Sequence, residues 1–287
     1  MPKLAYVNGR FLPQGQAGVS IEDRGFQLSD GVYEVWAVFD GKLVDAQGHF
    51  ARLERSLGEL MITPPMSQAA LTTVLRETVR RNRIVNGTVY LQITRGAAPR
   101  DHAFPTPAPR PTMVVTARKT DLAVAEARAA AGVKVITLPD IRWGRCDIKT
   151  ISLLPNVLAR QSAKEQGAYE AFLVDQEGLV TEGAASNAWI VDADGILRTR
   201  DLGANILRGV TRRSLADLAR KAGLTVEERA FTVTEAKGAR EAFLTGAGSL
   251  IMPVVRIDDQ NIADGRPGAV AKQLRALYIQ HGRKSAI

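Results

Sequence analysis

Alternating apolar and polar residues predict β-strands in four segments of the first half of the chain. Two of these segments contain a dipeptide, Asn8-Gly9 or Asp40-Gly41, that favours the tight turn of a hairpin, so each predicts a pair of strands. The four segments are LAYVNGRFL (4–12), GVYEVWAVFDGKLVD (31–45), GTVYLQITRG (87–96) and RPTMVVTAR (110–118).

A different spacing predicts two helices between these strands, at residues 49–60 and 67–84. Apolar residues recur every three or four positions in both, and the hydroxyl of Ser67 can cap the second helix. A Pro-rich connection, AAPRDHAFPTPAPRP (97–111), then separates the last two strands. Connections of that length inside a compact domain are often functional.

The second half of the chain, from about residue 121, mixes hairpins with helices. This order argues for an α+β protein rather than a regular alternation of strand and helix. The expected elements are a strand at 131–138, a helix at 153–167, hairpins at 170–183 and 187–199, a helix ended by Gly223 at 209–223, and a strand at 240–249.

Composition excludes several classes of protein. The 287 residues are 45% hydrophobic and 24% charged, in the range of soluble globular enzymes. The longest apolar runs are too short to span a bilayer, and the first residues have no signal-peptide core. One cysteine cannot form an internal disulfide, which suits a reducing cytoplasm, and the three histidines form no cluster with zinc spacing. We therefore expect a cytoplasmic protein with no metal site and no membrane partner.

The net charge of +8 raises the alternative of a nucleic-acid-binding protein without catalysis. Lysine and arginine are scattered, however, and no basic tail or aromatic stacking segment accompanies them. We interpret the charge as solvated surface. The glycine patterns of dinucleotide and nucleoside-triphosphate sites are absent from the sequence too.

Two segments have the character of phosphate sites. In ILRGVTRRSLADL, Gly209 precedes a helix whose first N–H groups and Thr211 hydroxyl can bind an anion. In LTGAGSL, Thr245–Ser249 is a turn of small residues after a strand, where backbone can approach a ligand closely. Either segment alone is common, but together they suggest one phosphate held at two points.

A site for one phosphate, together with a candidate reactive amine, suggests pyridoxal phosphate as the cofactor. This cofactor requires a lysine for a Schiff base and an acid that keeps its pyridine nitrogen protonated. Lys149, in RCDIKT, is the candidate amine, and Glu182, in VTEGAASNAW, is the candidate acid. The plain alternatives are a surface lysine and a solvated hairpin glutamate.

A string of fixed positions gives the sequence its resemblance to a known family. It consists of Glu182, the small residues GAAS, Asn187, an aromatic position at Trp189, Thr199 and the segment ILRGVTR. By this string the chain resembles the fold-type IV pyridoxal-phosphate enzymes, or class IV aminotransferases, over nearly its whole length. Trp189 stands where the family usually has Phe or Tyr, and we interpret it as a packing variant.

Three further segments are similar to those of family members that act on D-amino acids. They are EDRGFQLSDGVYEV (22–35), TRGAAPRDHAFP (94–105) and RWGRCDIKTISLL (142–154). The resemblance implies transamination between a D-amino acid, such as D-alanine, and a 2-oxo acid, such as 2-oxoglutarate. It also implies a smaller, sandwich-like N-terminal α/β domain (1–120), a larger domain with a barrel-like β core (121–287), and the cofactor between them.

Residue roles follow from the same resemblance. Lys149 corresponds to the Schiff-base lysine and Glu182 to the partner of the pyridine nitrogen. The phosphate ligands correspond to Arg52, Val210, Thr211, Gly246 and Ala247. Tyr33, Arg100 and His102 correspond to a trap for the substrate α-carboxylate, with Arg100 and His102 supplied by the partner subunit of a homodimer.

Some positions depart from this pattern or leave alternatives open. Ala184, Ala185, Gly246 and Ala247 replace hydroxyl residues of the D-specific enzymes, which leaves backbone N–H groups to bind the cofactor there. His49 is interpreted as structural, and Cys146 as a small buried residue rather than a nucleophile. The alternative activities on the same cofactor are a branched-chain L-amino-acid transaminase and an aminodeoxychorismate lyase.

Overall fold

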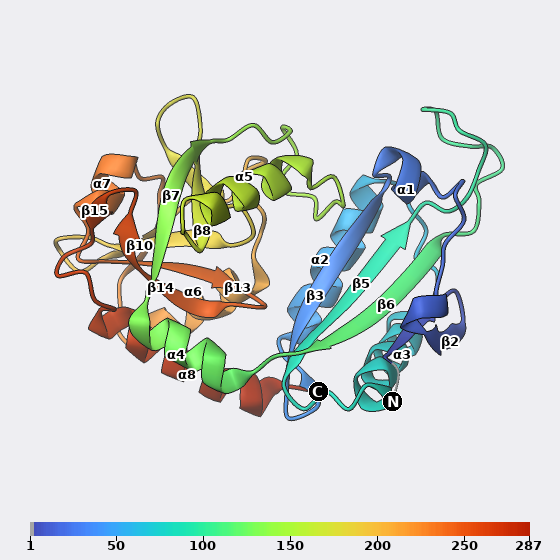
Figure 1. Ribbon diagram of the computed structural model, residues 1–287, viewed down its shortest axis with the longest axis horizontal. Coiled ribbons are helices and arrows are strands. Elements are labelled where there is room, and N and C mark those ends of the chain that lie inside the picture. The colour runs from blue at the N-terminus through green and yellow to red at the C-terminus, as the bar shows by residue number, and fades with distance from the viewer. Residues whose placement is uncertain (1–2) are drawn as a thin grey trace. The chain divides into compact units, whose positions relative to one another are not determined.

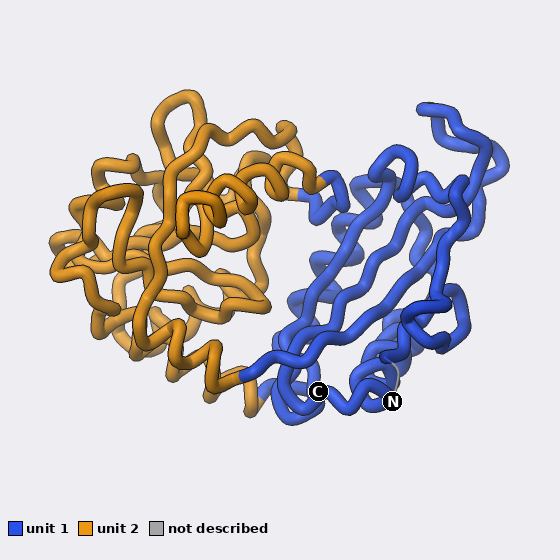
Figure 2. The backbone as a smooth tube through the Cα atoms, in the orientation of Figure 1, with its two compact units in different colours: residues 1–121, 148–152, 285–287 blue, residues 122–147, 153–284 orange. Residues whose placement is uncertain are grey.

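The computed structural model describes residues 3–287, which form two compact units (Figure 2). Unit 1 contains the described residues up to Asp121 together with Ile148–Ser152 and Ser285–Ile287. Unit 2 contains Leu122–Asp147 and Leu153–Lys284. A division at residue 120, as expected from the sequence, would assign 148–152 and 285–287 to the second domain. In the structure both segments belong to unit 1, because their backbones pair with its strands.

Unit 1 is built on a six-stranded sheet with the order β2-β1-β6-β5-β3-β4, and each neighbouring pair is antiparallel. Its strands are β1 (Leu4–Val7), β2 (Arg10–Pro13), β3 (Gly31–Phe39), β4 (Lys42–Leu43), β5 (Gly87–Thr94) and β6 (Thr112–Lys119). Both predicted hairpin turns are confirmed. Asn8 and Gly9 have φ values of 44° and 98°, and Asp40 and Gly41 have 50° and 77°, the left-handed conformations that a tight hairpin turn requires.

Helices cover one face of this sheet (Figure 1). The covering helices are α2 (Ala46–Glu59) and α3 (Gln68–Arg81), and unit 1 also contains the short helix α1 (Arg24–Leu28) and the 3-10 helix η1 (Gln14–Gln16). Leu53 and Leu57 of α2 and Leu75 of α3 join Trp36 of β3 in one buried core. The Ser67 hydroxyl accepts a hydrogen bond from Ala70 N, so the predicted cap of α3 is confirmed.

Unit 2 contains a nine-stranded sheet with the order β12-β11-β10-β13-β14-β7-β8-β9, and β15 pairs with β14. Its strands are β7 (Val133–Pro139), β8 (Glu170–Val174), β9 (Val180–Gly183), β10 (Asn187–Val191), β11 (Leu197–Thr199), β12 (Val226–Glu228), β13 (Glu241–Gly246), β14 (Leu250–Ile257) and β15 (Gln260–Asn261). The sheet curls, so its last strand β9 returns beside β10. The expected barrel-like β core and the α+β class are therefore confirmed.

The helices of unit 2 flank this curled sheet (Figure 1). They are α4 (Leu122–Ala131), α5 (Leu154–Glu165), α6 (Val210–Lys221), α7 (Val233–Lys237) and α8 (Ala269–Ser285). The sequence pattern predicts α5 and α6, whereas α4, α7, β14 and α8 become evident only in the structure. Among residues 3–287, no helix combines the length and the apolar character needed to cross a membrane.

Candidate active site

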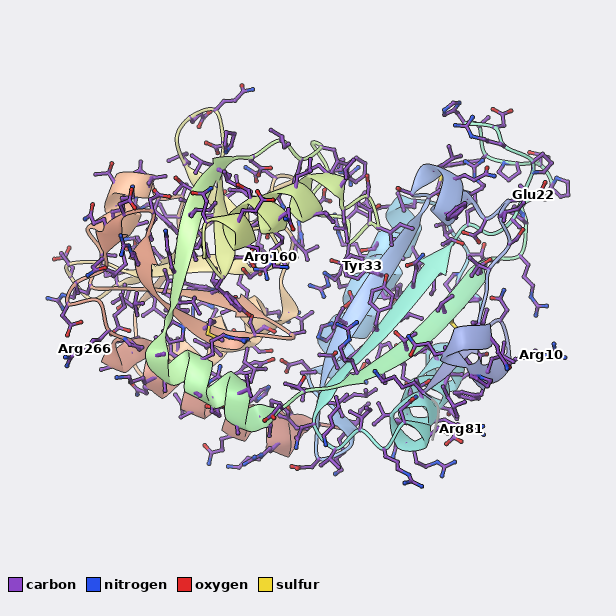
Figure 3. All side chains as sticks on the ribbon, in the orientation of Figure 1. Arg10, Glu22, Tyr33, Arg81, Arg160 and Arg266 are labelled. Carbon is purple, nitrogen blue, oxygen red and sulfur yellow. The ribbon has the colours of Figure 1, made fainter. Side chains whose placement is uncertain are left out.

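Lys149 lies on an extended segment that continues the sheet of unit 1 along β3. Tyr33 N donates to Lys149 O at 3.0 Å, and Ile151 N donates to Gly31 O at 3.1 Å. Side chains alternate between the two faces of paired extended segments, so Lys149 emerges on the same face as Tyr33. Its Nζ lies 4.1 Å from the centroid of the Tyr33 ring, which projects from β3 (Figure 3). Backbone pairing thus fixes the main chain from which this primary amine projects.

The neighbouring residue on β3, Glu34, points to the opposite face and meets α2. Arg52 Nε donates to Glu34 Oε1 at 2.7 Å, and a terminal nitrogen of Arg52 donates to Oε2 at 2.8 Å. His49 Nδ1 lies 2.7 Å from Glu34 Oε2. His49 is buried within this cluster, as its structural interpretation expects. Arg52 is therefore held in a fixed orientation by a fully buried carboxylate.

Burial and the charges of this cluster shift the pKa values of Glu34 and His49. Burial raises the pKa of Glu34, but the charge and hydrogen bonds of Arg52 outweigh it and bring the pKa to about 2. Burial lowers the pKa of His49 below its ordinary value, in spite of the opposing charge of Glu34. Glu34 is consequently ionised, and His49 neutral, at physiological pH.

Glu34→Gln should lower the free energy of unfolding by roughly 3 kcal/mol at pH 7, because one pKa unit corresponds to about 1.4 kcal/mol. The native pKa of Glu34 is depressed, so this contribution is present above the unfolded value of 4.5 and is lost as the pH falls toward about 2. Urea unfolding at pH 7 and at a pH between those two values measures it. The difference between wild type and variant should be smaller at the lower pH.

Glu77→Gln is the matched control for this prediction. Glu77 pairs with Arg80 and Arg81 on α3, and their hydrogen bonds bring its pKa to about 2 as well. This pair lies at the surface, so water screens it and its loss should change stability little. Equal destabilisation by the two substitutions would contradict the role given to burial.

Arg100 and His102 lie on the connection between β5 and β6, and both side chains are exposed. The backbone of the same connection is fixed, because Arg24 donates to the carbonyl oxygens of Asp101 (2.6 Å) and His102 (3.4 Å). The expected trap residues are therefore presented outward on an anchored loop.

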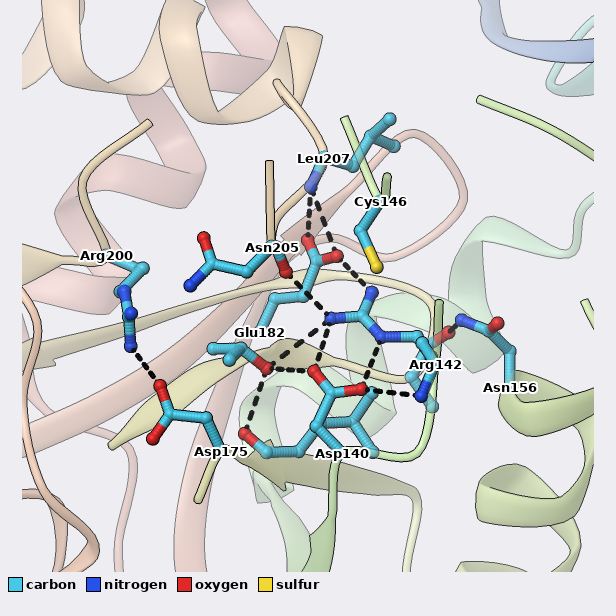
Figure 4. Close-up of polar contacts among 12 residues, drawn as sticks. Asp140, Arg142, Cys146, Asn156, Asp175, Glu182, Arg200, Asn205 and Leu207 are labelled. Atoms are coloured by element: carbon cyan, nitrogen blue, oxygen red, sulfur yellow. Dashed lines mark hydrogen bonds and ion pairs between the residues drawn. The ribbon is translucent and has the colours of Figure 1, made fainter. Parts of the chain in front are cut away.

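In unit 2, Glu182 of β9 is a buried carboxylate inside a network of donors (Figure 4). Asn187 Nδ2 donates to its Oε2 at 2.8 Å, and Leu207 N donates to both oxygens at 3.1 and 3.2 Å. Arg142 also donates to Oε1. Donors to the charged form favour ionisation, so this arrangement holds a carboxylate anion in one orientation.

Arg142 is itself anchored by Asp140, which follows β7. Nε and a terminal nitrogen of Arg142 donate to the two carboxylate oxygens of Asp140 at 2.9 and 2.7 Å. Burial raises the pKa of Asp140, but Arg142 outweighs it and leaves the pKa below its ordinary value. Burial acts to lower the pKa of Arg142, yet Asp140 and Glu182 raise it above its ordinary value. Asp140 thus orients the guanidinium that orients Glu182.

The two candidate phosphate segments lie close to Glu182 within unit 2. Gly209 precedes α6 and offers no side-chain cap to its first N–H groups, and Val210 and Thr211 open that helix. A β-carbon at Gly209 would collide with the amide of Asn187, the residue that bonds Glu182. Asn187 is also the register partner of Thr245 on β13, which ends at Gly246.

Gly246 and Ala247 begin the small-residue turn after β13. A β-carbon at Gly246 would lie 3.2 Å from Ser249 Oγ and 3.5 Å from the carbonyl oxygen of Ala185. The turns at 184–186 and 246–249 are therefore neighbours. Backbone and small side chains line this part of unit 2, together with an uncapped helix start.

The burial of Trp189 and Cys146 agrees with the interpretation of each residue from the sequence. Trp189 is fully buried, stacks on Phe243 with ring centroids 5.7 Å apart, and donates from Nε1 to Thr245 Oγ1 at 3.0 Å, as expected of a packing variant. Cys146 is buried, and burial raises the pKa of its thiol to about 11. A thiol with that pKa is protonated at neutral pH and is a poor nucleophile.

Comparison with known proteins identifies the family. The family model for amino-transferase class IV matches residues 31–257. The chain belongs to the class IV aminotransferases. It is 38% identical over 278 residues to D-alanine aminotransferase of Staphylococcus epidermidis, covering 96% of this chain and 97% of the relative. It is 40% identical over 268 residues to D-alanine aminotransferase of Bacillus licheniformis, with 93% of each covered.

Solved structures agree with this assignment. A branched-chain amino acid aminotransferase from T.th., solved with pyridoxamine 5'-phosphate, has a TM-score of 0.89 and 26% identity to this aminotransferase, covering 99% of this chain and 95% of that one. Class IV aminotransferases depend on pyridoxal phosphate. The present chain is accordingly a pyridoxal-phosphate-dependent transaminase.

The residues of this aminotransferase fit the chemistry of that cofactor. A primary amine suits its aldehyde, and an oriented buried carboxylate suits a protonated pyridine nitrogen. An uncapped helix start next to a glycine suits a phosphate, because its N–H groups and dipole attract anions. Lys149, Glu182 and the start of α6 supply these three features.

Three structurally decisive residues were missed by sequence reasoning. Arg142 and Glu34 orient expected site residues, and Arg24 anchors the loop of Arg100. A signal existed for Glu34, because a charged residue in an otherwise apolar strand implies a buried partner. Nothing in the sequence pairs Arg142 with Glu182, which lies 40 residues away.

Proposed function

We propose that the enzyme transfers an amino group between a D-amino acid, such as D-alanine, and a 2-oxo acid, such as 2-oxoglutarate. The observation that carries this proposal is the identity of 38–40% to D-alanine aminotransferases across nearly the full length of both chains. A branched-chain L-amino-acid activity is the second candidate. It is supported by the TM-score of 0.89, but the corresponding identity is only 26%.

When bound, pyridoxal phosphate supplies an aldehyde for amines and a ring that withdraws electrons from the substrate Cα. Lys149 contributes the ε-amine that holds the cofactor covalently. Once released by the incoming amino group, Lys149 Nζ would take the proton from the substrate Cα and deliver it to C4′ of the cofactor. The backbone hydrogen bond from Tyr33 N to Lys149 O supports this role, because it holds the main chain of Lys149 beside β3.

Glu182 keeps a proton on the pyridine nitrogen in this proposal. Its support is the ring of donors from Arg142, Asn187 and Leu207, which hold the carboxylate ionised and oriented. Arg52, Val210, Thr211, Gly246 and Ala247 bind the phosphate. Since Ala184, Ala185, Gly246 and Ala247 carry no hydroxyl, backbone N–H groups are the donors at those positions.

Arg100 and His102, with Tyr33, bind the substrate α-carboxylate. A guanidinium fork matches a carboxylate in geometry and charge. We further propose that the enzyme is a cytoplasmic homodimer and that Arg100 and His102 act in the partner's site. Their outward exposure on an anchored loop supports this, and the free, buried Cys146 suits a reducing compartment.

Assaying D-alanine against L-leucine, each with 2-oxoglutarate, tests the proposed function. Faster turnover of D-alanine supports it. Preference for L-leucine would replace it with the branched-chain activity. Elimination from aminodeoxychorismate without transamination would assign the lyase instead.

Arg100→Ala should lower kcat/KM for D-alanine by roughly ten- to a hundredfold, since a charged hydrogen-bonded pair contributes about 1.5–3 kcal/mol. The half-reaction with an amine that lacks a carboxylate should change little. Arg110→Ala is the matched control, because Arg110 is an exposed arginine of the same connection. If Arg100→Ala slows both substrates equally, Arg100 does not bind the carboxylate.

Mixing two impaired variants tests which subunit supplies Arg100. Refolding equal amounts of Lys149→Ala and Arg100→Ala chains together should restore about a quarter of wild-type activity if Arg100 acts in the partner's site, because half of the dimers then hold one intact site. If Arg100 serves its own subunit, no mixed dimer contains an intact site. Activity would then stay at the level of the unmixed variants.

A further inference from the structure

The connection that carries Arg100 and His102 has no helix or strand of its own. Side chains 99–104 are all exposed, so burial of side chains does not order this part of the chain. A loop whose task is to present a charged fork to a carboxylate must nevertheless hold that fork in place. The residues that order it therefore have to be sought in the protein beneath it.

Arg24 of α1 is one of them. It is 2% exposed, and its guanidinium donates to the carbonyl oxygens of Asp101 and His102. Its Nε donates to Asp30 Oδ2 at 2.8 Å. A buried arginine is tolerated only when its charge and N–H groups are matched. Two of the groups that match Arg24 are main-chain oxygens directly after Arg100, so this side chain fixes the backbone there.

Arg95, which directly follows β5, is the second residue that orders the loop. It is 7% exposed, and it donates to both carboxylate oxygens of Asp30, at 2.7 and 3.0 Å. Its guanidinium also lies 3.6 Å from the centroid of the Phe104 ring, which is half exposed. Stacking of a guanidinium on an aromatic ring is attractive and favours one orientation. Arg95 thus attaches the loop on the far side of His102.

Asp30 bonds to both arginines, and contacts with the main chain hold the cluster in unit 1. Arg95 donates to the carbonyl oxygen of Leu60 at 2.7 Å. Arg24 N donates to Gly96 O at 2.9 Å, which ties α1 to the start of the connection. One carboxylate therefore connects two buried cations, and each of them holds a different point of the exposed loop.

We propose that Arg24, Asp30 and Arg95 are positioning residues that set the location of Arg100 and His102, and thereby the preference for substrates with an α-carboxylate. None of the three touches the reacting atoms in this proposal. The inference rests on the proposed function for the identity of the substrate. The ordering of the loop by the cluster does not depend on that identity.

The test compares three variants of the pyridoxal-phosphate-loaded enzyme. Arg24→Lys keeps the charge but loses the fork that reaches Asp30 and two carbonyl groups at once. Phe104→Ala removes the ring from Arg95 and, being half exposed, leaves the core intact. Phe26→Ala is the matched control, because Phe26 is a phenylalanine of the same unit whose ring is 73% exposed and packs little against other side chains.

Hydrogen–deuterium exchange of residues 99–110 is the first readout. Exchange should accelerate in Arg24→Lys and Phe104→Ala but not in Phe26→Ala. The second readout is the ratio of kcat/KM for D-alanine to that for an amine without a carboxylate. This ratio should fall by roughly ten- to a hundredfold in Arg24→Lys and by roughly two- to fivefold in Phe104→Ala.

Exchange at the wild-type rate in both variants would overturn the inference. So would faster exchange with an unchanged substrate ratio, because the loop would then be ordered without serving the carboxylate. If wild type prefers L-leucine, the proposed D-specific function fails. The same ratio, measured with L-leucine, then still decides whether the cluster positions the carboxylate ligands.

Discussion

Lys149→Ala should abolish covalent attachment of pyridoxal phosphate and slow transamination by roughly 10²- to 10⁴-fold or more. In the proposed mechanism, the variant loses both the amine that holds the cofactor and the base that moves the Cα proton. Its fold should survive, because the hydrogen bonds at residue 149 are made by the main chain: N donates to Ser56 Oγ and O accepts from Tyr33 N. Borohydride reduction followed by peptide mass spectrometry measures the attachment.

Two controls sharpen this prediction. Lys149→Arg keeps a cation near the Tyr33 ring but cannot join an aldehyde in the same way, so it should be as inactive as the alanine variant. Added ethylamine should partly restore proton transfer in Lys149→Ala, because a small amine can occupy the vacated volume. A cofactor adduct that persists on a different lysine would show that Lys149 is not the anchor.

Glu182→Gln should reduce kcat by roughly a hundred- to several thousandfold while the cofactor stays bound through its phosphate. Removing one member of a buried charge pair typically costs about 3–5 kcal/mol, and each 1.4 kcal/mol corresponds to a factor of about ten in rate. The amide keeps the size of the side chain, so Asn187 and Leu207 can still donate to its oxygen. Rapid-quench kinetics and the visible spectrum of the bound cofactor measure the effect.

Glu170→Gln is the matched control for Glu182. Glu170 is a second buried carboxylate of unit 2, and burial raises its pKa despite the nearby Arg160. A glutamine there should be tolerated, because the amide keeps the size of the side chain and its oxygen can still accept from Ala171 N. Full activity of Glu182→Gln with bound cofactor would show that another group serves the pyridine nitrogen.

Local sequence rules predict the elements that depend on local chemistry. The hairpins at Asn8-Gly9 and Asp40-Gly41 follow from turn residues with positive φ, and the start of α3 follows from the Ser67 cap. These rules do not predict β14, because it is apolar on both faces and its sequence does not alternate between apolar and polar residues. Its assignment depends on pairing with β13 and with β7, which is more than a hundred residues earlier.

The residues of the candidate site likewise fall into those that the sequence predicts and those that it does not. The sequence motifs predict Lys149 and Glu182 as site residues, because the cofactor requires a lysine and an acid. The groups that orient them cannot be read along the chain. Arg142 becomes the partner of Glu182 only when β7 and β9 are placed in one curled sheet, and Glu34 becomes the partner of Arg52 only when α2 lies on β3.

The discontinuity of unit 1 has a consequence for how the enzyme matures. A nascent chain folds as it emerges, N-terminal part first. Residues up to 121 can form their sheet early, but β3 gains its neighbour along Gly31–Tyr33 only when the segment 148–152 has been made. That same segment carries Lys149, the proposed reactive amine. If Lys149 anchors the cofactor as proposed, the anchor takes its place beside β3 only after the 26 residues 122–147 of unit 2 have been made.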